Sequence, residues 1–255
     1  SRGCPYACTY CGAPLVTGRK HRARSAKNVV DEMELYVGKG FKRFGIMDDA
    51  FNVDLDRAKE VCRLIIERKL DIVWDMGNGI RANTVDQEFL QLLKKAGCNF
   101  VCFGMESGNE EMLRKIKKGL KIEHIHKAVQ YCNEVGMGVS VNFIIGHPGE
   151  TYETAMETLN TAETLPASYV NIYGLLPMKG TEAYNQLKEL EKKGDATFLY
   201  DHDYYIEHFS SQGIDPVFET RELSKEARRK LLIRGRNITK RRAMEYRLGK
   251  IPGGW

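Results

Sequence analysis

The chain has 255 residues, which is enough for one large domain or for one domain with an appendage. Hydrophobic residues make up 42% of the sequence, so a sizeable core can form, yet no apolar run approaches the roughly 18 residues of a membrane span. The net charge is +5, no signal peptide is visible, and the seven cysteines do not form the pattern of a small disulfide-rich domain.

The first dozen residues carry three cysteines, Cys4, Cys8 and Cys11, in the spacing C-x3-C-x2-C. Thiolates so close in sequence can converge on one metal centre. An ordinary four-iron cluster takes four cysteines, so three would leave one iron open to a small molecule. A zinc knuckle, which needs a fourth ligand, or a fortuitous cluster is the alternative. The remaining cysteines stand in apolar stretches and are predicted to be buried: Cys62, Cys98, Cys102 and Cys132.

Beyond a short basic loop at 19–24, hydrophobic periodicity predicts alternating helices and strands. Ser25, Asp54 and Thr151 are suited to begin helices, and Thr84 with Gln87 resembles a capping box. The predicted strands are 41–47, 72–76, 100–105, 138–145 and 168–175. The predicted helices are 26–37, 55–69, 85–96, 109–116, 122–135, 151–165 and one that ends at 193.

The alternation of strand and helix, five times through residue 193, is typical of an α/β fold with parallel strands. Ligands of such sheets bind at the carboxyl ends of the strands. Each predicted strand here ends in a polar or glycine-rich turn, and residues 77–79 are interpreted as one of these turns. We therefore expect the functional residues at this edge of the sheet.

Residues 195–255 differ from the preceding core and are predicted to be a C-terminal extension to a first domain at 1–194. Residues 195–220 are aromatic and polar without a helical period, as in an irregular or strand-bearing closing segment. Ser224 opens a long basic amphipathic helix that runs to about Leu248, and 252–255 are predicted to be a tail. Residues 222–250 carry a local charge of +8. A solvated helix face is the favoured interpretation, and binding of nucleic acid stays open as the alternative.

The cysteine spacing and the strand-end motifs together resemble the radical S-adenosylmethionine (radical SAM) family. The resemblance covers residues 1–184 and includes the segments 104–108, 142–151 and 175–184. It implies a partial (β/α)6 barrel, similar to a TIM barrel, whose first strand would precede Cys4; this leaves five strands and predicts a fragment truncated at its N-terminus. It also implies a [4Fe–4S] cluster, held by three cysteines, that cleaves S-adenosylmethionine to a 5′-deoxyadenosyl radical, which then removes hydrogen from a substrate.

The resemblance assigns roles to single residues near S-adenosylmethionine. Tyr10 would lie near the adenine, as would backbone groups of Leu175 and Leu176 after the last strand. Glu106, followed by Ser107, would accept hydrogen bonds from the ribose hydroxyls. The remaining assignments are Lys118 toward the methionyl carboxylate, Asn142 toward the ribose or methionyl end, Gly146 in the turn after the fourth strand of the chain, and His147 as a proton carrier or a structural histidine.

The turn after the first strand of this chain favours one branch of the family. Where many relatives have a Gly-Gly-Glu-like motif for the methionyl amine, this chain has Asp48 and Asp49. Asn78 and Arg81, at the next strand end, would face the same region, with Arg81 either on a carboxylate or phosphate or in a structural salt bridge. These motifs resemble the branch with an N-terminal cobalamin-binding domain, which includes methyltransferases and an oxidative cyclase.

The sequence thus predicts an enzyme with a small-molecule substrate, a reducing partner such as flavodoxin or ferredoxin, and cobalamin, if used, on a domain outside this fragment. The reduced cysteines and an oxygen-labile cluster favour a cytoplasmic location. A tRNA-modifying methylthiotransferase of the same family is the alternative enzyme, in which the basic helix would hold RNA. An iron–sulfur electron carrier is the non-enzyme alternative, although carriers usually fill all four iron positions with cysteine.

Overall fold

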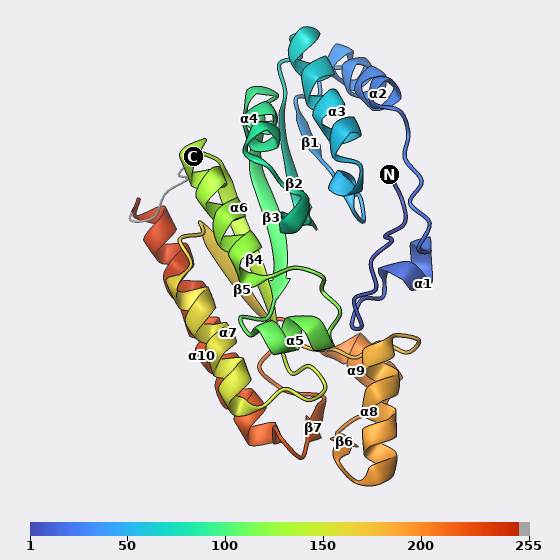
Figure 1. Ribbon diagram of the computed structural model, residues 1–255, viewed down its shortest axis with the longest axis vertical. Helices are drawn as coiled ribbons and strands as arrows, with labels where there is room; N and C mark the ends of the chain where they lie inside the picture. Colours follow the sequence, from blue (N-terminus) through green and yellow to red (C-terminus); the bar gives the residue numbers. More distant parts are fainter. Residues whose placement is uncertain (250–255) are drawn as a thin grey trace.

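The computed structural model describes residues 1–249, so the predicted tail at 252–255 lies outside the described residues. Five parallel strands form one sheet in the order β1-β2-β3-β4-β5 (Figure 1). This confirms the predicted five-stranded parallel α/β fold. No strand of residues 1–249 pairs with the outer edge of β1 or of β5, so the sheet is not closed into a barrel. The strands are β1 Arg43–Gly45, β2 Val73–Ile80, β3 Cys98–Glu106, β4 Gly138–Ile145 and β5 Tyr169–Gly174.

Six helices cover the sheet (Figure 1), and among them α2 packs against α3, α3 against α4, and α10 returns to pack against α7. Their buried faces and the sheet form one core around Trp74, Phe103 and Phe143, and the four scattered cysteines are buried as predicted. The covering helices are α2 Ala26–Gly38, α3 Leu55–Glu67, α4 Gln87–Lys95, α6 Ile122–Glu134, α7 Tyr152–Thr164 and α10 Lys225–Arg247.

The helices begin at residues whose side chains accept hydrogen bonds from the first backbone N–H groups, which have no partner within the helix. Ser25, Asp54 and Thr151 cap α2, α3 and α7, as predicted. The predicted capping box at Thr84 is wrong, because Asp86 accepts from the N–H of Phe89 and begins α4 there. The Thr84 hydroxyl instead accepts from Asn52, at the short 3-10 helix η2 Ala82–Thr84.

Two strand predictions need correction. The first strand is a short edge strand rather than a long buried one, and its flanking residues Phe41 and Met47 are 58% and 75% exposed. The second strand does not stop before residues 77–79, because β2 runs through them to Ile80 with a shift in register against β3. Glycines inside a strand often mark such an irregularity.

The closing segment contains more regular structure than its sequence indicated. After α8 Glu182–Lys193, the strands β6 Ala196–Phe198 and β7 Phe218–Thr220 pair antiparallel, and α9 His202–His208 lies between them. This segment forms the lower end of the molecule in Figure 1. The division into domains at 194 and 195 stays a prediction.

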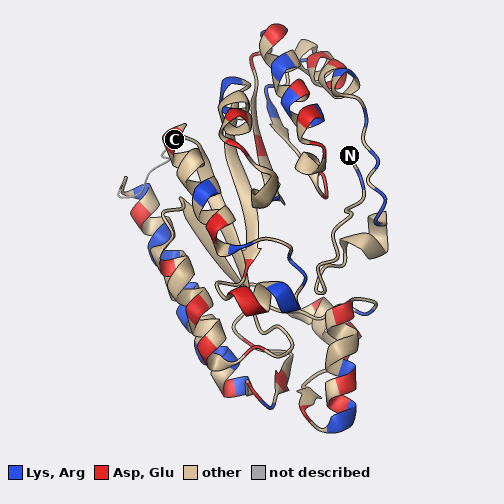
Figure 2. Ribbon diagram, in the orientation of Figure 1, with Lys and Arg blue, Asp and Glu red and all other residues tan. Residues whose placement is uncertain are grey.

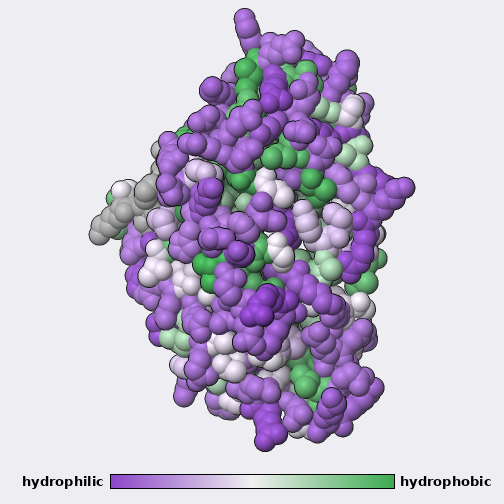
Figure 3. Space-filling model, in the orientation of Figure 1, coloured by the Kyte–Doolittle hydropathy of each residue, from purple (hydrophilic) through white to green (hydrophobic). Residues whose placement is uncertain are grey.

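Helix α10 is basic along its length (Figure 2) and packs on β5 and α7. The face seen in Figure 3 is mainly hydrophilic, with small hydrophobic patches between charged side chains. Within residues 1–249, every helix is too short or too polar to cross a bilayer.

Candidate active site

The cysteine segment is held against the sheet by backbone hydrogen bonds at several points. The N–H of Gly3 donates to the Asp49 carboxylate, which follows β1, at 2.8 Å. In the middle of the segment, the N–H of Thr9 donates to the carbonyl of Ile116 at 3.0 Å, and the carbonyl of Thr9 accepts from Ala183 at 2.9 Å. Helix α1 Ala13–Thr17 follows the third cysteine. The segment is therefore anchored at the turn after β1, at Ile116 and at the start of α8.

Cys4, Cys8 and Cys11 are all free, partly exposed thiols of this segment. Burial raises the pKa of Cys11, and the neighbouring Cys8 and Cys4 raise it further, although the N–H of Ala13 and the Lys118 cation oppose them. Within residues 1–249, no three cysteine, histidine or acidic side chains converge on a point that would hold a single ion. A cluster of four irons does not need that convergence, because each thiolate binds a different iron. Three thiols on one short segment are the donor set that a four-iron cluster with one open iron would need.

Tyr10, Lys118 and Glu106 form a hydrogen-bonded group beside the cysteines. The Lys118 ammonium donates to the Glu106 carboxylate at 2.7 Å and to the Tyr10 hydroxyl at 3.1 Å. Glu106 and Lys118 are only 7% and 8% exposed. The pKa of Tyr10 is raised, first by burial and then by the Glu106 and Cys8 charges. The structure therefore brings together three residues that the sequence assigned to one site.

Glu106 has a strained backbone at the end of β3. Its φ of 74° lies in the left-handed region, which is uncommon for residues other than glycine. Strain of this kind collects at functional sites, where the surrounding structure holds it. Gly104 makes room for the group, because a Cβ there would lie 2.3 Å from a Glu106 carboxylate oxygen and 2.9 Å from the Lys118 ammonium. Directly after Glu106, Ser107 is buried and its hydroxyl bonds to that of Thr158, so it supports the turn.

An open cleft of about 560 Å³ lies next to this group at the carboxyl ends of the strands. Among the predicted residues, Tyr10, Cys11, Glu106, Asn142 and Leu176 all line it. The cleft also has an apolar wall, of which the sequence indicated only Leu175. Its members from β4, β5 and the following segments are Ile144, Tyr173, Leu175, Met178 and Ile206.

Asp48 and Asn78 lie at the ends of β1 and β2 and are joined to each other rather than to the cleft. The Asn78 amide donates to the carbonyls of Met47 and Asp48, at 3.4 and 2.9 Å. The Asp48 carboxylate accepts from Ser1. Asn78 therefore fixes where these two carbonyls point, in the turn that the resemblance places at the methionyl amine.

Arg81 is buried and reaches the cysteine segment from the end of β2. Its guanidinium lies 3.8 Å from the centre of the Tyr6 ring and donates to the carbonyls of Lys118 and Gly119. These contacts give Arg81 a positioning role, since it ties the cysteine segment to the turn that carries Lys118. No carboxylate of residues 1–249 forms an ion pair with it.

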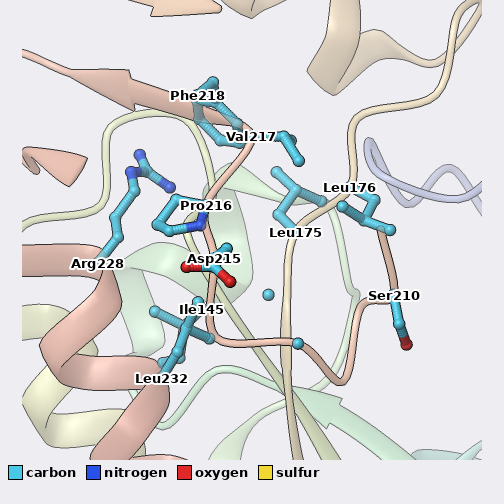
Figure 4. A pocket seen from close by; sticks show the side chains of 12 residues that line it. Ile145, Leu175, Leu176, Ser210, Asp215, Pro216, Val217, Phe218, Arg228 and Leu232 are labelled. Carbon is cyan, nitrogen blue, oxygen red and sulfur yellow. The ribbon is translucent and has the colours of Figure 1, made fainter. Parts of the chain in front are cut away.

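A buried group lies behind the cleft, in the turn after β4. Arg228 of α10 donates to the carbonyl of Gly146 at 3.0 Å, and the N–H of Gly146 donates to Glu150. A Cβ at Gly146 would lie 2.3 Å from the Arg228 guanidinium. Figure 4 shows Arg228 beside Phe218 and across from Leu175, around a cavity of about 10 Å³. No local sequence pattern indicates this contact, because 82 residues separate its partners.

His147 is fully buried, and neither ring nitrogen has a hydrogen-bond partner among residues 1–249. Its ring meets the ring of Tyr10 edge-on at 5.4 Å. Burial, with the Arg228 and Lys118 charges, lowers its pKa to about 3, so the ring is neutral at neutral pH. These contacts favour the structural interpretation of His147 over that of a proton carrier.

Comparison with known proteins agrees with this geometry. An uncharacterized methyltransferase of Pyrococcus horikoshii is 30% identical over 241 residues, which are 92% of this chain and 52% of the relative. Cytidylyl-2-hydroxyethylphosphonate methyltransferase of Streptomyces wedmorensis is 33% identical over 202 residues, covering 76% of this chain and 37% of the relative. This chain thus spans about half of the first relative and less of the second.

A solved structure shares the fold. It is that of the radical S-adenosylmethionine methyltransferase TsrM from Kitasatospora setae, with tryptophan substrate and a SAM analog bound. The TM-score is 0.67 with 25% identity, over 76% of this chain and 39% of the other. Residues 1–162, which include the cysteines, the Glu106 turn and the β4 turn, match the sequence pattern of the Radical SAM superfamily. The chain therefore belongs to the radical SAM superfamily.

Proposed function

We propose that this chain is the catalytic core of a radical SAM enzyme, with a [4Fe–4S] cluster on Cys4, Cys8 and Cys11. The observation that carries the proposal is that Cys11 and Tyr10 of the cysteine segment line the same cleft as Glu106 and Asn142. When bound, the cluster supplies the electron that cleaves S-adenosylmethionine to methionine and a 5′-deoxyadenosyl radical, which removes hydrogen from the substrate.

The residues of the cleft divide into polar and apolar groups that suit S-adenosylmethionine. Glu106 would accept from the ribose hydroxyls while Lys118 holds its second oxygen, and Asn142 would bind the ribose or methionyl end. Tyr10 and backbone groups of Leu175 and Leu176 would contact the adenine, with the Gly146 turn behind them. The carbonyls of Met47 and Asp48, oriented by Asn78, would receive the methionyl amine.

The apolar wall around Tyr173 and Met178 would exclude water and oxygen from the reacting atoms. We propose further that the reaction is a methyl transfer to a small molecule, as in the two named methyltransferases that the chain resembles. Cobalamin would then bind to a domain outside this chain, and flavodoxin or ferredoxin would supply the electron.

The test is anaerobic reconstitution of the chain with iron and sulfide. We expect about four irons and four sulfides per chain, and 5′-deoxyadenosine after addition of a reductant and S-adenosylmethionine. Replacing Cys4, Cys8 or Cys11 with Ala should abolish both results. The matched variant Cys132→Ala, in a buried cysteine of α6, should retain the iron and sulfide. Stoichiometric zinc without labile sulfide in the anaerobically purified protein would contradict the proposal.

A further inference from the structure

A second cavity opens at the free edge of β5, beside the cleft. Its volume is about 210 Å³, room for several groups of the size of a water molecule, each of about 30 Å³. Only β4 pairs with β5 among residues 1–249, so the opposite edge of β5 faces this cavity instead of a strand. Its walls come from β5, from residues 212–213 and from one face of α10.

Two cations on α10 line this edge cavity without a partner. Arg236 and Lys240 stand four residues apart on the helix, and neither side chain forms a hydrogen bond or an ion pair within residues 1–249. Several other cations of the same helix are paired. Arg241 bonds to Glu163 at 2.6 Å, and Arg229 lies 3.6 Å from Asp215. The edge cavity is thus a place on α10 where two positive charges meet at a concave surface without an acidic neighbour.

Thr239 adds an unsatisfied polar group to the same cavity. Its hydroxyl oxygen is buried and has no hydrogen-bond partner in the described chain. A buried hydroxyl without a partner costs free energy, so most are satisfied by protein, water or ligand. Two cations and a hydroxyl donor are the groups that recognise an oxyanion.

Tyr173 and Asn171 connect the edge cavity with the cleft. Tyr173 lines both spaces, and Asn171, which lines the edge cavity, donates to the side chain of Asn142 in the cleft at 3.0 Å. The two spaces are therefore adjacent, with the Tyr173 side chain as their shared wall.

We propose that Arg236, Lys240 and Thr239 bind an anionic group of the substrate, a carboxylate or a phosphoryl group, and so direct the rest of the substrate past Tyr173 into the cleft. This assigns the substrate to the class of small organic anions. The assignment rests on the proposed function, but the anion site itself is defined by α10 and β5 and can be tested without the cluster.

The experiment titrates the full chain with two probes, acetate and methylphosphonate, and follows binding by NMR. The double variant Arg236→Gln/Lys240→Gln should weaken binding of the preferred probe at least about tenfold. The matched double variant Lys230→Gln/Arg247→Gln removes the same charge from α10 outside the cavity and should bind as the wild type does. Thr239→Val keeps the charge and the side-chain shape, and should weaken binding by a smaller factor. The better probe identifies the phosphoryl or the carboxylate class.

Equal weakening in the two double variants would overturn the site in favour of a general charge effect, and no binding of either probe would also overturn it. Salt-sensitive binding of a structured RNA that falls equally in both variants would instead assign α10 to nucleic acid. Cleavage of S-adenosylmethionine by the reconstituted wild type is measured separately. Its absence, with anion binding retained, would overturn the proposed function and leave the anion site intact.

Discussion

Glu106 combines three features at one position, namely a left-handed backbone, burial and an ion pair with Lys118. A carboxylate whose one oxygen is held by a buried cation presents its other oxygen in a fixed direction. This preorganisation is what a residue that binds ribose hydroxyls requires, since it reduces the cost of ordering on binding.

Replacing Glu106 with Gln should weaken binding of S-adenosylmethionine to the reconstituted protein by about 1–3 kcal/mol, the range for losing a hydrogen bond to a charged group. The affinity can be read from the change that S-adenosylmethionine causes in the electron paramagnetic resonance of the reduced cluster. Glu111→Gln, in an exposed carboxylate of the nearby helix α5 Glu110–Lys115, is the control. An unchanged affinity in Glu106→Gln would remove this residue from the site.

Glu150 should make stability depend on pH. Burial raises the pKa of this carboxyl from 4.5 to about 7, although Gly146 and Arg228 favour the charged form. Because the folded-state pKa is raised, its contribution to the free energy of unfolding is complete below pH 4.5 and is lost as the pH rises to about 7. The loss is on the order of 3 kcal/mol.

Urea unfolding of wild type and Glu150→Gln between pH 4 and pH 8 measures this effect. The wild type should lose stability relative to the variant as the pH rises, and the difference should level off above about pH 7. Glu153→Gln, in an exposed carboxylate of α7, should follow the wild type. A constant difference between wild type and Glu150→Gln across the range would contradict the assignment.

Helix α10 packs against the core of the fold through its apolar face. Leu231, Leu232 and Ile238 are buried against the sheet, and Gly235 lets α10 approach Ile172 of β5 closely. Several of its arginines bond to α7 or to the loop that follows α7. These contacts agree with the prediction that the positive charges lie on a helix whose other face is apolar.

Truncating Leu231 to Ala should lower the free energy of unfolding by about 2–5 kcal/mol, the cost of a cavity at a buried leucine. Arg229→Gln removes an exposed cation two residues earlier and should cost less than about 1 kcal/mol. Chemical denaturation of the two variants decides between a structural helix and a charged surface. A larger loss in Arg229→Gln would contradict the packing described here.

The sequence predicted most elements of the fold because their signals are local. Cap residues such as Ser25 and Thr151, and the apolar periods that follow them, mark helix starts directly. The extent of the first strand was wrong because its apolar residues lie at an open sheet edge, and residues 77–79 were misread because a glycine-rich strand resembles a turn. Helix α9 lies in an aromatic segment without a clear helical period.

For the whole molecule, the candidate site could be predicted only in part. Glu106 and Asn142 belong to short motifs near the ends of β3 and β4, so topology alone brings them to one edge, whereas the cysteines are recognised by their spacing. Arg228 and the edge cavity depend on how α10 folds back over the sheet, which no local pattern records. The hydrogen bonds from Asn78 to the carbonyls that follow β1 likewise depend on the register between β1 and β2.

The backbone bonds of Thr9 have a consequence for the order of assembly. Its N–H is held by Ile116 and its carbonyl by Ala183, both more than 100 residues further along the chain. During synthesis, the cysteines therefore emerge before their anchoring partners, which are complete only after β5 and α8 have been made. Contacts so distant in sequence form late, because they require closure of a long loop. The cysteine segment is thus completed among the last, so insertion of iron and sulfide into the proposed cluster site would follow folding.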